Sequence, residues 1–540
     1  MMRRRRIVVA AAAFAALAAL LAGCVQSSTS STTTSGGGLG DGSTVLRVLA
    51  GSEVKDMLPI LAEAEKAIGV KVELDYIGTL DGTEEVASGG AKGKYDATWF
   101  PNNRYLSLLP GASTAIGASV KIMSSPVVFG LRQSVAQKLG WDTKPPTWAD
   151  LAQAASAGDF SYGMTNPAAS NSGFSALVSV ATALSGTGTS LTDADITTVT
   201  PQMSTFFSGQ KLTAGSSGFL ADKFSADPTS VDGIINYESV LKGLKIKGEP
   251  ISIITPTDGV VTSDYPLTLL SSAAAAKKPL FTKLTNWLRT TKIQKEIASQ
   301  THRRPGVPGI DTGNEFPKTV AFETPFPNTL DVANTLIAVY LDAARPPAQT
   351  LFVLDTSGSM EGSRLESLQQ ALKNLAGADT STTGSFAEFA NRERVTLLPF
   401  NTKPGTATTF EVPQDNKDAV LAQIRNYADQ LVAGGNTDIY STLKKAYGIA
   451  LQQQSDRPGT IVSIVLMTDG ENNQGISESD FEKYFKSLGS EGTSIPTYVV
   501  LFGDANVDEL TKLATATGGT TFDALNGDLA SAFRAIRGYQ

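Results

Sequence analysis

The sequence predicts an α/β protein with two globular bodies, each built around a mostly parallel β-sheet. From Thr44 onward, short apolar runs alternate with helical stretches, and repeated strand–helix alternation favours parallel sheets. The alternation starts again after Arg345–Pro347, where a pair of prolines ends a helix. In this second series the runs Ile461–Met467 and Tyr498–Phe502 lack alternating polar residues, which indicates strands covered on both faces. We therefore expect two successive α/β bodies joined near residue 345.

The N-terminal segment has the features of a cleaved signal peptide. Arg3–Arg6 precede the apolar run Ile7–Ala22, which is shorter than the roughly 20 residues needed to span a bilayer. Small residues then lead to a cysteine in the sequence Leu21–Cys24. This short sequence resembles the lipobox of bacterial lipoproteins. The resemblance implies removal of residues 1–23, lipidation of Cys24 and anchoring of the mature chain to a membrane.

Residues 24–43 are expected to form a tether between the lipid and the folded protein. Ser27–Ser43 is almost wholly Ser, Thr and Gly, a composition typical of flexible linkers. Without Arg3–Arg6, the remaining 41 Lys and Arg face 52 Asp and Glu, a net charge of −11. We therefore expect an acidic, lipid-anchored protein at the extracytoplasmic face of the cell membrane, with no nucleic acid as a partner.

The composition also excludes several classes of site. The chain has 540 residues, of which one is cysteine, Cys24, and one is histidine, His302. A disulfide framework or a structural zinc site cannot be built from one of each. A Cys–His or Ser–His–Asp catalytic group would have to use these two residues. His302 has no visible nucleophile beside it and is interpreted as a cation at a helix end. The sequence therefore predicts a binding protein and not an enzyme.

The first body is predicted to cover residues 44–345, with a helical connector from about residue 313. Strands and helices are expected in the following order: a strand at Val45–Leu49, a helix at Val54–Ile68, strands at Val70–Tyr76, Ala97–Phe100 and Val127–Leu131, a helix with Leu280, Leu284, Trp287 and Leu288 on one face, and a helix carrying Leu330, Ala333, Ile337, Tyr340 and Leu341. This alternation of strands and helices favours a mostly parallel β-sheet in the first body.

Three loops of the first body are rich in small polar side chains. The first loop follows the first strand, and the second precedes a helix expected to begin near Ser175. The third contains an aromatic residue beside a carboxylate. A helix N-terminus preceded by Ser and Asn can bind an anion or a polar solute, although such residues are also common as ordinary caps. The loops resemble the ligand loops of two-lobed (type II) bacterial solute-binding proteins over residues 44–312. Carried over, this implies a ligand cleft lined by Ser52, Thr165, Asn166, Ser170, Asn171, Ser172 and Tyr237.

The second body, residues 346–540, carries oxygen side chains at the ends of its predicted strands. Asp355, Ser357 and Ser359 follow the strand Leu351–Leu354, and Asp469 follows Ile461–Met467. A Gly-rich turn between these loops supplies a further hydroxyl from Thr437. In an open α/β sheet such loops meet at the carboxyl edge, and hydroxyls with carboxylates are hard ligands that suit Mg²⁺. A single Asp–Ser turn could equally be a helix cap, but three loops with matching residues favour a metal site.

This pattern resembles the metal-ion-dependent adhesion site of von Willebrand factor type A domains, which have a doubly wound, Rossmann-like fold. The likeness extends from about Thr350 to the end of the chain. It implies Mg²⁺ or another hard divalent cation, held directly by Ser357 and Ser359, at times by Thr437, and through water by Asp355 and Asp469. A carboxylate of a partner protein would fill the open position. Asp438 is left as either an acceptor behind the ligands or a helix cap.

Together these features predict a membrane-anchored extracellular binding protein. The type A domain would engage a protein partner through Mg²⁺, and the first body would hold a small polar or anionic solute. The alternative is the receptor of an ABC importer, with the type A domain as an accessory.

Overall fold

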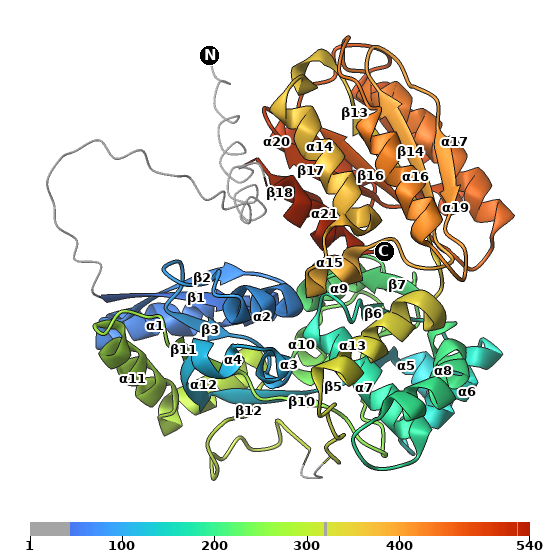
Figure 1. The fold of residues 1–540 in the computed structure, drawn as a ribbon. Coiled ribbons are helices and arrows are strands. Elements are labelled where there is room, and N and C mark those ends of the chain that lie inside the picture. Colours follow the sequence, from blue (N-terminus) through green and yellow to red (C-terminus); the bar gives the residue numbers. More distant parts are fainter. Residues whose placement is uncertain (1–43, 318–320, 526–527) are drawn as a thin grey trace, which may run out of the picture. The chain divides into compact units, whose positions relative to one another are not determined.

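The computed structural model describes residues 44–317, 321–525 and 528–540, which form three β-sheets flanked by helices (Figure 1). Two sheets build the lobes of the N-terminal body, and the third builds the C-terminal body. This arrangement confirms the predicted two-lobed α/β domain followed by a doubly wound α/β domain. The signal peptide, Cys24 and the tether lie outside the described residues, within which no helix is both long and apolar enough to cross a bilayer.

Lobe 1 is built on a five-stranded sheet with the order β2-β1-β3-β11-β4. Its strands are β1 (Val45–Ala50), β2 (Lys71–Tyr76), β3 (Ala97–Trp99), β4 (Ile116–Lys121) and β11 (Pro266–Leu270), and its helices are η2 (Ser52–Met57), α1 (Leu58–Ile68), α2 (Thr79–Ala87), α3 (Arg104–Leu108), α4 (Ala112–Ala115), α11 (Lys277–Leu288) and α12 (Thr291–Thr301). β1 pairs in parallel with β2 and β3, whereas β11 is antiparallel to β3. The helix expected at Val54–Ile68 begins as a 3₁₀ turn, and its α-helical part starts beside Pro59.

Lobe 2 contains a seven-stranded sheet in which the long β5 has several partners. The path is β10-β5-β8-β6-β7, and β9 and β12 also pair with β5. The strands are β5 (Met123–Arg132), β6 (Tyr162–Thr165), β7 (Gln210–Ala214), β8 (Gly233–Tyr237), β9 (Ile251–Ile254), β10 (Thr262–Ser263) and β12 (Arg304–Pro305), and the helices are α5 (Gln133–Lys138), α6 (Trp148–Ala157), α7 (Asn171–Ser185), α8 (Asp193–Phe207), α9 (Ser217–Ala226) and α10 (Glu238–Gly243). Helix α7 begins four residues before the expected Ser175, which places Asn171 and Ser172 in its first turn.

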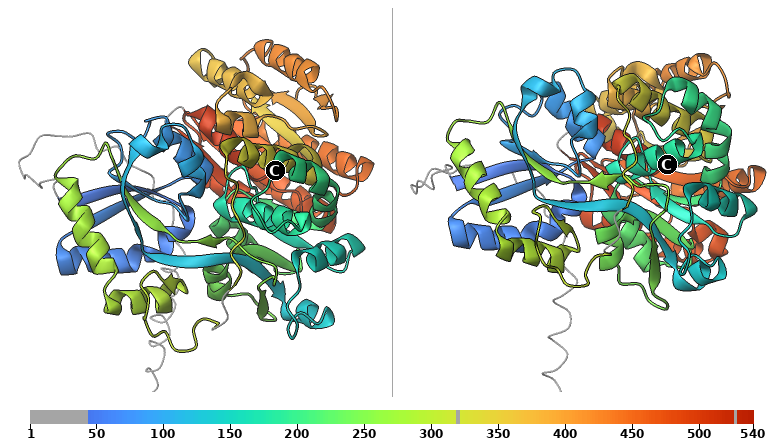
Figure 2. Two further views of the ribbon diagram at one scale, coloured as in Figure 1. Left: turned by 60° about the horizontal axis from the view of Figure 1, so that its bottom comes forward. Right: turned by 90° about the horizontal axis from the view of Figure 1, so that it is seen from below.

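The chain passes between the lobes beside β5 and again between β10 and β11 (Figure 2). Tyr265 lies at the second crossing with φ of 40°, a conformation that non-glycine residues rarely adopt. Its backbone is held on both sides, because its N–H donates to the Pro101 carbonyl at 2.8 Å and its own carbonyl accepts from Trp99 Nε1 at 3.1 Å. The crossing is therefore fixed by hydrogen bonds to lobe 1.

The C-terminal body follows a connector made of α13 (Leu330–Val339) and η3 (Tyr340–Ala344). Its six-stranded sheet has the order β15-β14-β13-β16-β17-β18 and is parallel except for β15. The strands are β13 (Ala348–Asp355), β14 (Arg394–Phe400), β15 (Thr408–Glu411), β16 (Ile461–Thr468), β17 (Thr497–Phe502) and β18 (Thr521–Ala524). The helices are η4 (Gly358–Met360), α14 (Ser363–Lys373), η5 (Asn374–Ala378), α15 (Thr382–Ala387), α16 (Asp418–Asp429), α17 (Ile439–Asp456), α18 (Glu478–Lys486), α19 (Gly489–Thr493), α20 (Val507–Ala516) and α21 (Leu529–Arg537).

Helices cover both faces of this sheet. Phe352 and Leu354, which point to the same face of β13, pack in one apolar cluster that includes Phe533 of α21. Leu351 and Val353, which point to the opposite face, belong to a second cluster with helix α17. Every residue of β13 is therefore buried.

Candidate functional site

The predicted metal residues gather at the carboxyl edge of the C-terminal sheet. Asp355 is the last residue of β13, and Asp469 directly follows the neighbouring β16. The strand after β13 in the chain, β14, lies on the side of β13 opposite to β16. Loops at such a switch in strand order leave a crevice in open α/β sheets, which is where ligands bind. The topology thus delivers both carboxylates to this crevice.

Hydrogen bonds join the first and third of the predicted loops. Asp355 is fully buried, and its carboxylate accepts from the Ser357 N–H at 2.8 Å and the Thr468 hydroxyl at 2.6 Å. The hydroxyls of Ser357 and Ser359 lie 3.0 Å apart, and the Ser359 hydroxyl donates to Asp469 Oδ1 at 2.7 Å. Four of the five predicted metal residues therefore belong to one hydrogen-bonded group.

Thr437 approaches the same group from the Gly-rich turn. A Cβ placed on Gly470 would lie 3.8 Å from Ser359 Oγ and 3.9 Å from Thr437 Oγ1, so both hydroxyls border this glycine. The turn is attached to the first loop by the Gly358 N–H, which donates to the Gly435 carbonyl at 2.9 Å. Asp438 next to Thr437 caps α17 by accepting from the Ser441 N–H at 3.1 Å.

Arg364 places a positive charge beside the candidate metal site. Its guanidinium donates to Asp469 Oδ2 at 2.6 Å and to Asp504 Oδ2 at 2.7 Å. Asp469 is buried, whereas Asp504 is largely exposed, so the arginine offsets mainly the charge of Asp469. Burial raises the pKa of Asp355. Sequence reasoning missed Arg364, because its position in the first turn of α14 carries no motif that connects it to Asp469.

The donor set fits a hard divalent cation. Three hydroxyls and two carboxylates meet here, and neither sulfur nor imidazole is present. Among the described residues, no group of three or more His, Cys, Asp or Glu side chains is arranged to hold a metal. A metal site in this part of the chain would therefore depend on hydroxyl ligands, which Mg²⁺ accepts together with water.

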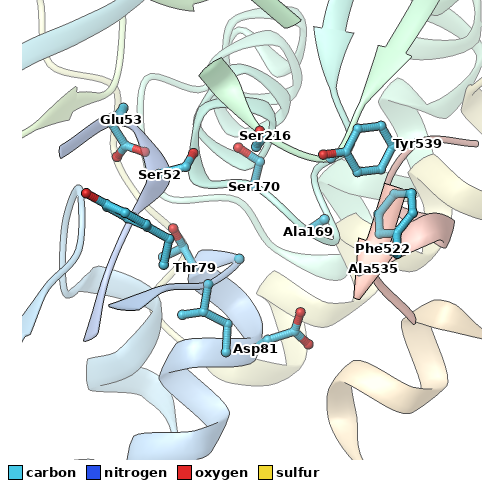
Figure 3. Close-up of a pocket in the computed structure, with 15 residues that line it drawn as sticks. Ser52, Glu53, Thr79, Asp81, Ala169, Ser170, Ser216, Phe522, Ala535 and Tyr539 are labelled. Carbon is cyan, nitrogen blue, oxygen red and sulfur yellow. The ribbon is translucent and has the colours of Figure 1, made fainter. Parts of the chain in front are cut away.

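A cavity of about 210 Å³ lies where both lobes meet the C-terminal body (Figure 3). Lobe 1 contributes Ser52 and Glu53 from η2 and Thr79 and Asp81 from α2, lobe 2 contributes Ser170 and Ser216, and the C-terminal body contributes Phe522, Ala535 and Tyr539. In Figure 3 the Tyr539 hydroxyl points toward Ser216 and Ser170 across the cavity. Three separate parts of the chain thus line one space.

Two of the seven predicted solute residues, Ser52 and Ser170, line this cavity. The other five are buried in hydrogen-bond networks. Thr165 and Ser217 each lie within 3 Å of the Ser172 hydroxyl, at 2.8 and 2.9 Å. The Ser172 side chain in the first turn of α7 is therefore hydrogen-bonded to other hydroxyls of the protein.

Asn171, Tyr237 and Asn166 have other partners. Asn171 Nδ2 donates to the Tyr237 hydroxyl at 3.0 Å and to Ser263 Oγ at 3.1 Å. Asn166 Nδ2 donates to the carbonyl of Arg537 in the C-terminal body at 3.1 Å. Sequence reasoning could not assign these partners, because each comes from a distant part of the chain.

Glu53 is the most perturbed carboxyl group in the cavity wall. Its Oε1 atom is buried and has no hydrogen-bond partner among the described residues. Burial raises the pKa of Glu53 to about 7, although nearby Arg303 opposes this shift. Arg303 itself donates to Asp56 and to the Glu53 carbonyl but not to the Glu53 carboxylate. The sequence alone gave Glu53 no role, because the burial of its carboxyl group depends on the fold.

The C-terminal body contacts both lobes. On lobe 1, the Glu84 carboxylate accepts from the N–H groups of Thr382 and Thr383 at 3.0 and 2.9 Å. On lobe 2, the Tyr539 ring packs edge-on against Phe219, with ring centroids 4.9 Å apart. The two lobes are therefore connected through the C-terminal body as well as through their crossing strands.

His302 has a structural environment. It ends α12 with φ of 54°, and its Nδ1 lies 2.9 Å from Glu315 Oε1. This position at the end of a helix agrees with the prediction.

Comparison with known proteins gives two family matches. The model of the bacterial extracellular solute-binding protein family matches residues 46–300, and that of the von Willebrand factor type A domain matches residues 351–534. The chain therefore combines a solute-binding-protein domain with a type A domain, as the sequence motifs predicted.

Several individual proteins are also similar to parts of the chain. The periplasmic binding protein AfuA from Actinobacillus pleuropneumoniae is 13% identical over 55% of this chain and 98% of its own, with a TM-score of 0.43. A von Willebrand factor type A protein from Catenulispora acidiphila is 18% identical over 36% of this chain and 43% of its own, with a TM-score of 0.29. Inter-alpha-trypsin inhibitor heavy chain H4 from Sus scrofa is 24% identical over 134 residues, which are 24% of this chain and 13% of that protein.

Proposed function

We propose that this protein is a lipid-anchored extracytoplasmic binding protein that engages a protein partner through a divalent cation in its type A domain. The solute-binding domain would hold a small ligand in the cavity. The observation that carries the proposal is the convergence of the Ser357 and Ser359 hydroxyls with the Asp469 carboxylate, over distances of 3.0 and 2.7 Å.

The type A residues would divide the work of holding the cation. Ser357, Ser359 and Thr437 would supply hydroxyl ligands, and Asp355 and Asp469 would hold them and bound water in place. A bound Mg²⁺ would supply an electrophilic position for a carboxylate of the partner. Because Arg364 already offsets the charge of Asp469, few uncompensated negative charges remain to satisfy the cation within the chain.

Two observations support a location at the outer face of the membrane. The solute-binding domain is of a bacterial extracellular type. The lipobox-like sequence Leu21–Cys24 predicts Cys24 as the lipidated residue. We expect a Cys24→Ala variant to lose labelling by a fatty-acid analogue and to leave the membrane fraction, whereas equal labelling of variant and wild type would refute the anchor.

The second candidate, a receptor of an ABC importer, is favoured by the solute-binding match over residues 46–300. In that case substitutions at the metal site should leave solute uptake unchanged. The bridging contacts of the type A domain favour the first candidate, because a receptor for import must open and close its two lobes freely.

Calorimetry with Mg²⁺ on the mature chain tests the metal proposal. We expect Ser359→Ala to weaken binding about tenfold or more, because it removes a direct ligand and the hydrogen bond to Asp469. Ser367→Ala is the matched control, since the Ser367 hydroxyl donates to the Ser363 carbonyl within α14. Equal heats from the wild type and Ser359→Ala would refute the site.

Partner engagement is tested separately by cross-linking on intact cells. A cross-linked product that depends on Mg²⁺ and disappears in Ser359→Ala is expected. A product that persists with EDTA would show that the partner binds elsewhere.

A further inference from the structure

We propose that the cavity between the two lobes and the type A domain binds a small organic cation with an ammonium group. This inference deepens the solute-binding half of the proposed function, and it replaces the predicted polar or anionic solute with a cationic one. It assigns the type A domain a direct part in holding that ligand, through Tyr539 and Phe522.

The charge of the lining favours a cation. Fifteen residues line the cavity, and they include the carboxylates of Glu53 and Asp81 but neither lysine nor arginine. Glu53 Oε1 is buried without a hydrogen-bond partner among the described residues. A buried anionic oxygen without a partner is costly, and a cationic ligand would remove that cost.

The basic residues near the two carboxylates are held by other groups. Arg303 donates to Asp56 and to the backbone carbonyl of Glu53, and its guanidinium lies 4.8 Å from the centre of the Tyr265 ring. Arg534, which lies near Asp81, donates to Asp379 at 3.0 Å. Neither guanidinium hydrogen-bonds the carboxylates that line the cavity, and Glu53 Oε1 remains available to a ligand.

Aromatic rings and hydroxyls complete an environment suited to an ammonium group. Tyr76, Phe522 and Tyr539 line the same cavity, and aromatic faces attract cations. The hydroxyls of Ser52 and Ser216 could accept hydrogen bonds from the N–H groups of a primary ammonium (Figure 3). The combination of carboxylates, rings and hydroxyls matches a small organic cation better than a metal ion.

The lining of this cavity has no basic side chain that could pair with an anion. In the first turn of α7, the Ser172 hydroxyl is bonded to the hydroxyls of Thr165 and Ser217. At α9, the Ser216 hydroxyl already accepts from the Phe219 N–H at 3.3 Å. The lining therefore offers an anion no charged partner, and its binding would depend on backbone N–H groups and hydroxyls alone.

The test measures ligand-induced thermal stabilisation and calorimetric binding on the mature chain. Choline, ethanolamine and putrescine are the cationic probes, and phosphate and citrate are the anionic ones, at matched ionic strength. The uncharged isostere of choline, dimethylbutanol, separates charge from shape. All titrations contain EDTA, so that failure here is distinguishable from failure of the proposed metal site.

Two pairs of variants connect the binding to the cavity. Glu53→Gln removes the charge without changing the size of the side chain, and Glu65→Gln makes the same change on the exposed face of α1. Tyr539→Phe keeps the aromatic ring in the wall, whereas Tyr539→Leu removes it. Unfolding of each variant without ligand checks that it is folded.

We expect at least one cationic probe to stabilise the wild type and Glu65→Gln, and Glu53→Gln to lower its affinity about tenfold or more. Tyr539→Leu should weaken binding more than Tyr539→Phe does. The proposal is overturned if none of the cations binds at millimolar concentration, if dimethylbutanol binds as well as choline, if the anions stabilise instead, or if Glu53→Gln and Glu65→Gln bind equally.

Discussion

Glu84 and Thr383 are joined by two hydrogen bonds, from the Thr383 N–H at 2.9 Å and from its hydroxyl at 2.6 Å to Oε2 of the glutamate. Glu84 lies on α2 of lobe 1, and Thr383 lies in the first turn of α15 of the type A domain. The type A domain is also bonded to lobe 2, where Asn166 donates to the Arg537 carbonyl. Any change in the separation of the lobes must therefore break one of these attachments or move the type A domain.

Loss of the Glu84 carboxylate should release α15 from lobe 1. We expect Glu84→Ala to speed hydrogen exchange in Thr382–Ala387 and to lower the free energy of unfolding by about 1–3 kcal/mol, because hydrogen bonds to a charged group are lost. Glu85→Ala is the matched control, since Glu85 forms an ion pair with the exposed Lys94. Unchanged exchange in α15 would mean that this attachment contributes little.

Arg364 should limit the affinity of the candidate metal site. Its guanidinium donates a hydrogen bond to Asp469 Oδ2 at 2.6 Å. The positive charge of the guanidinium would repel a cation at the site. We expect Arg364→Gln to tighten Mg²⁺ binding severalfold in calorimetry at low salt, with a smaller gain at high salt. Arg457→Gln, which removes an ion pair with Glu411 elsewhere in the domain, is the control. Weaker binding in Arg364→Gln would mean that the arginine instead holds Asp469 in position.

The fold was predictable because the apolar pattern of each strand reports how it is covered. Ile461–Met467 has no polar alternation, and both faces of β16 are buried. The start of α7 was harder to predict, because Asn171 and Ser172 disfavour helix interiors. Their side chains are satisfied by Tyr237 and Ser217 from distant segments, which overrides this local preference.

The two candidate sites differ in how far the sequence could predict them. Ser357 and Ser359 are two residues apart, so the contact of their hydroxyls is a local feature of one turn. The cavity depends on Tyr539 and Ser170, which are separated by most of the chain. They come together where the two lobes pack against the C-terminal body. No local pattern near the C-terminus indicates that Tyr539 reaches the solute-binding domain.

The contact of Tyr539 with Gly215 offers a test of this packing. A Cβ on Gly215 would lie 2.4 Å from Cε2 of the Tyr539 ring, which is too close for any side chain. We expect Gly215→Val to displace the C-terminal residues and to lower the free energy of unfolding by about 1–3 kcal/mol in urea. Gly218→Val is the control, because the space around that position is open. Equal stability of the two variants would show that Tyr539 moves aside without cost.

The ionisation of Glu53 should make stability depend on pH. Its pKa is raised to about 7, mainly by burial, so the folded protein keeps a proton there that the unfolded chain releases above pH 4.5. Stability relative to Glu53→Gln should therefore be highest below about pH 4.5, fall as the pH rises to about 7, and then stay level. The maximal change is about 3 kcal/mol, which follows from 1.36 kcal/mol per pKa unit.

Comparison with Glu53→Gln at each pH separates this effect from those of the neighbouring titratable and charged groups. These groups are Asp56, Tyr237, Tyr265 and Arg303. A cationic ligand requires the ionised carboxylate, so its affinity should rise through the interval in which the stability without ligand falls. Urea unfolding and choline titration across this pH range measure the two trends in the same samples. Parallel pH profiles of the wild type and Glu53→Gln in both measurements would contradict the assignment of this carboxyl group.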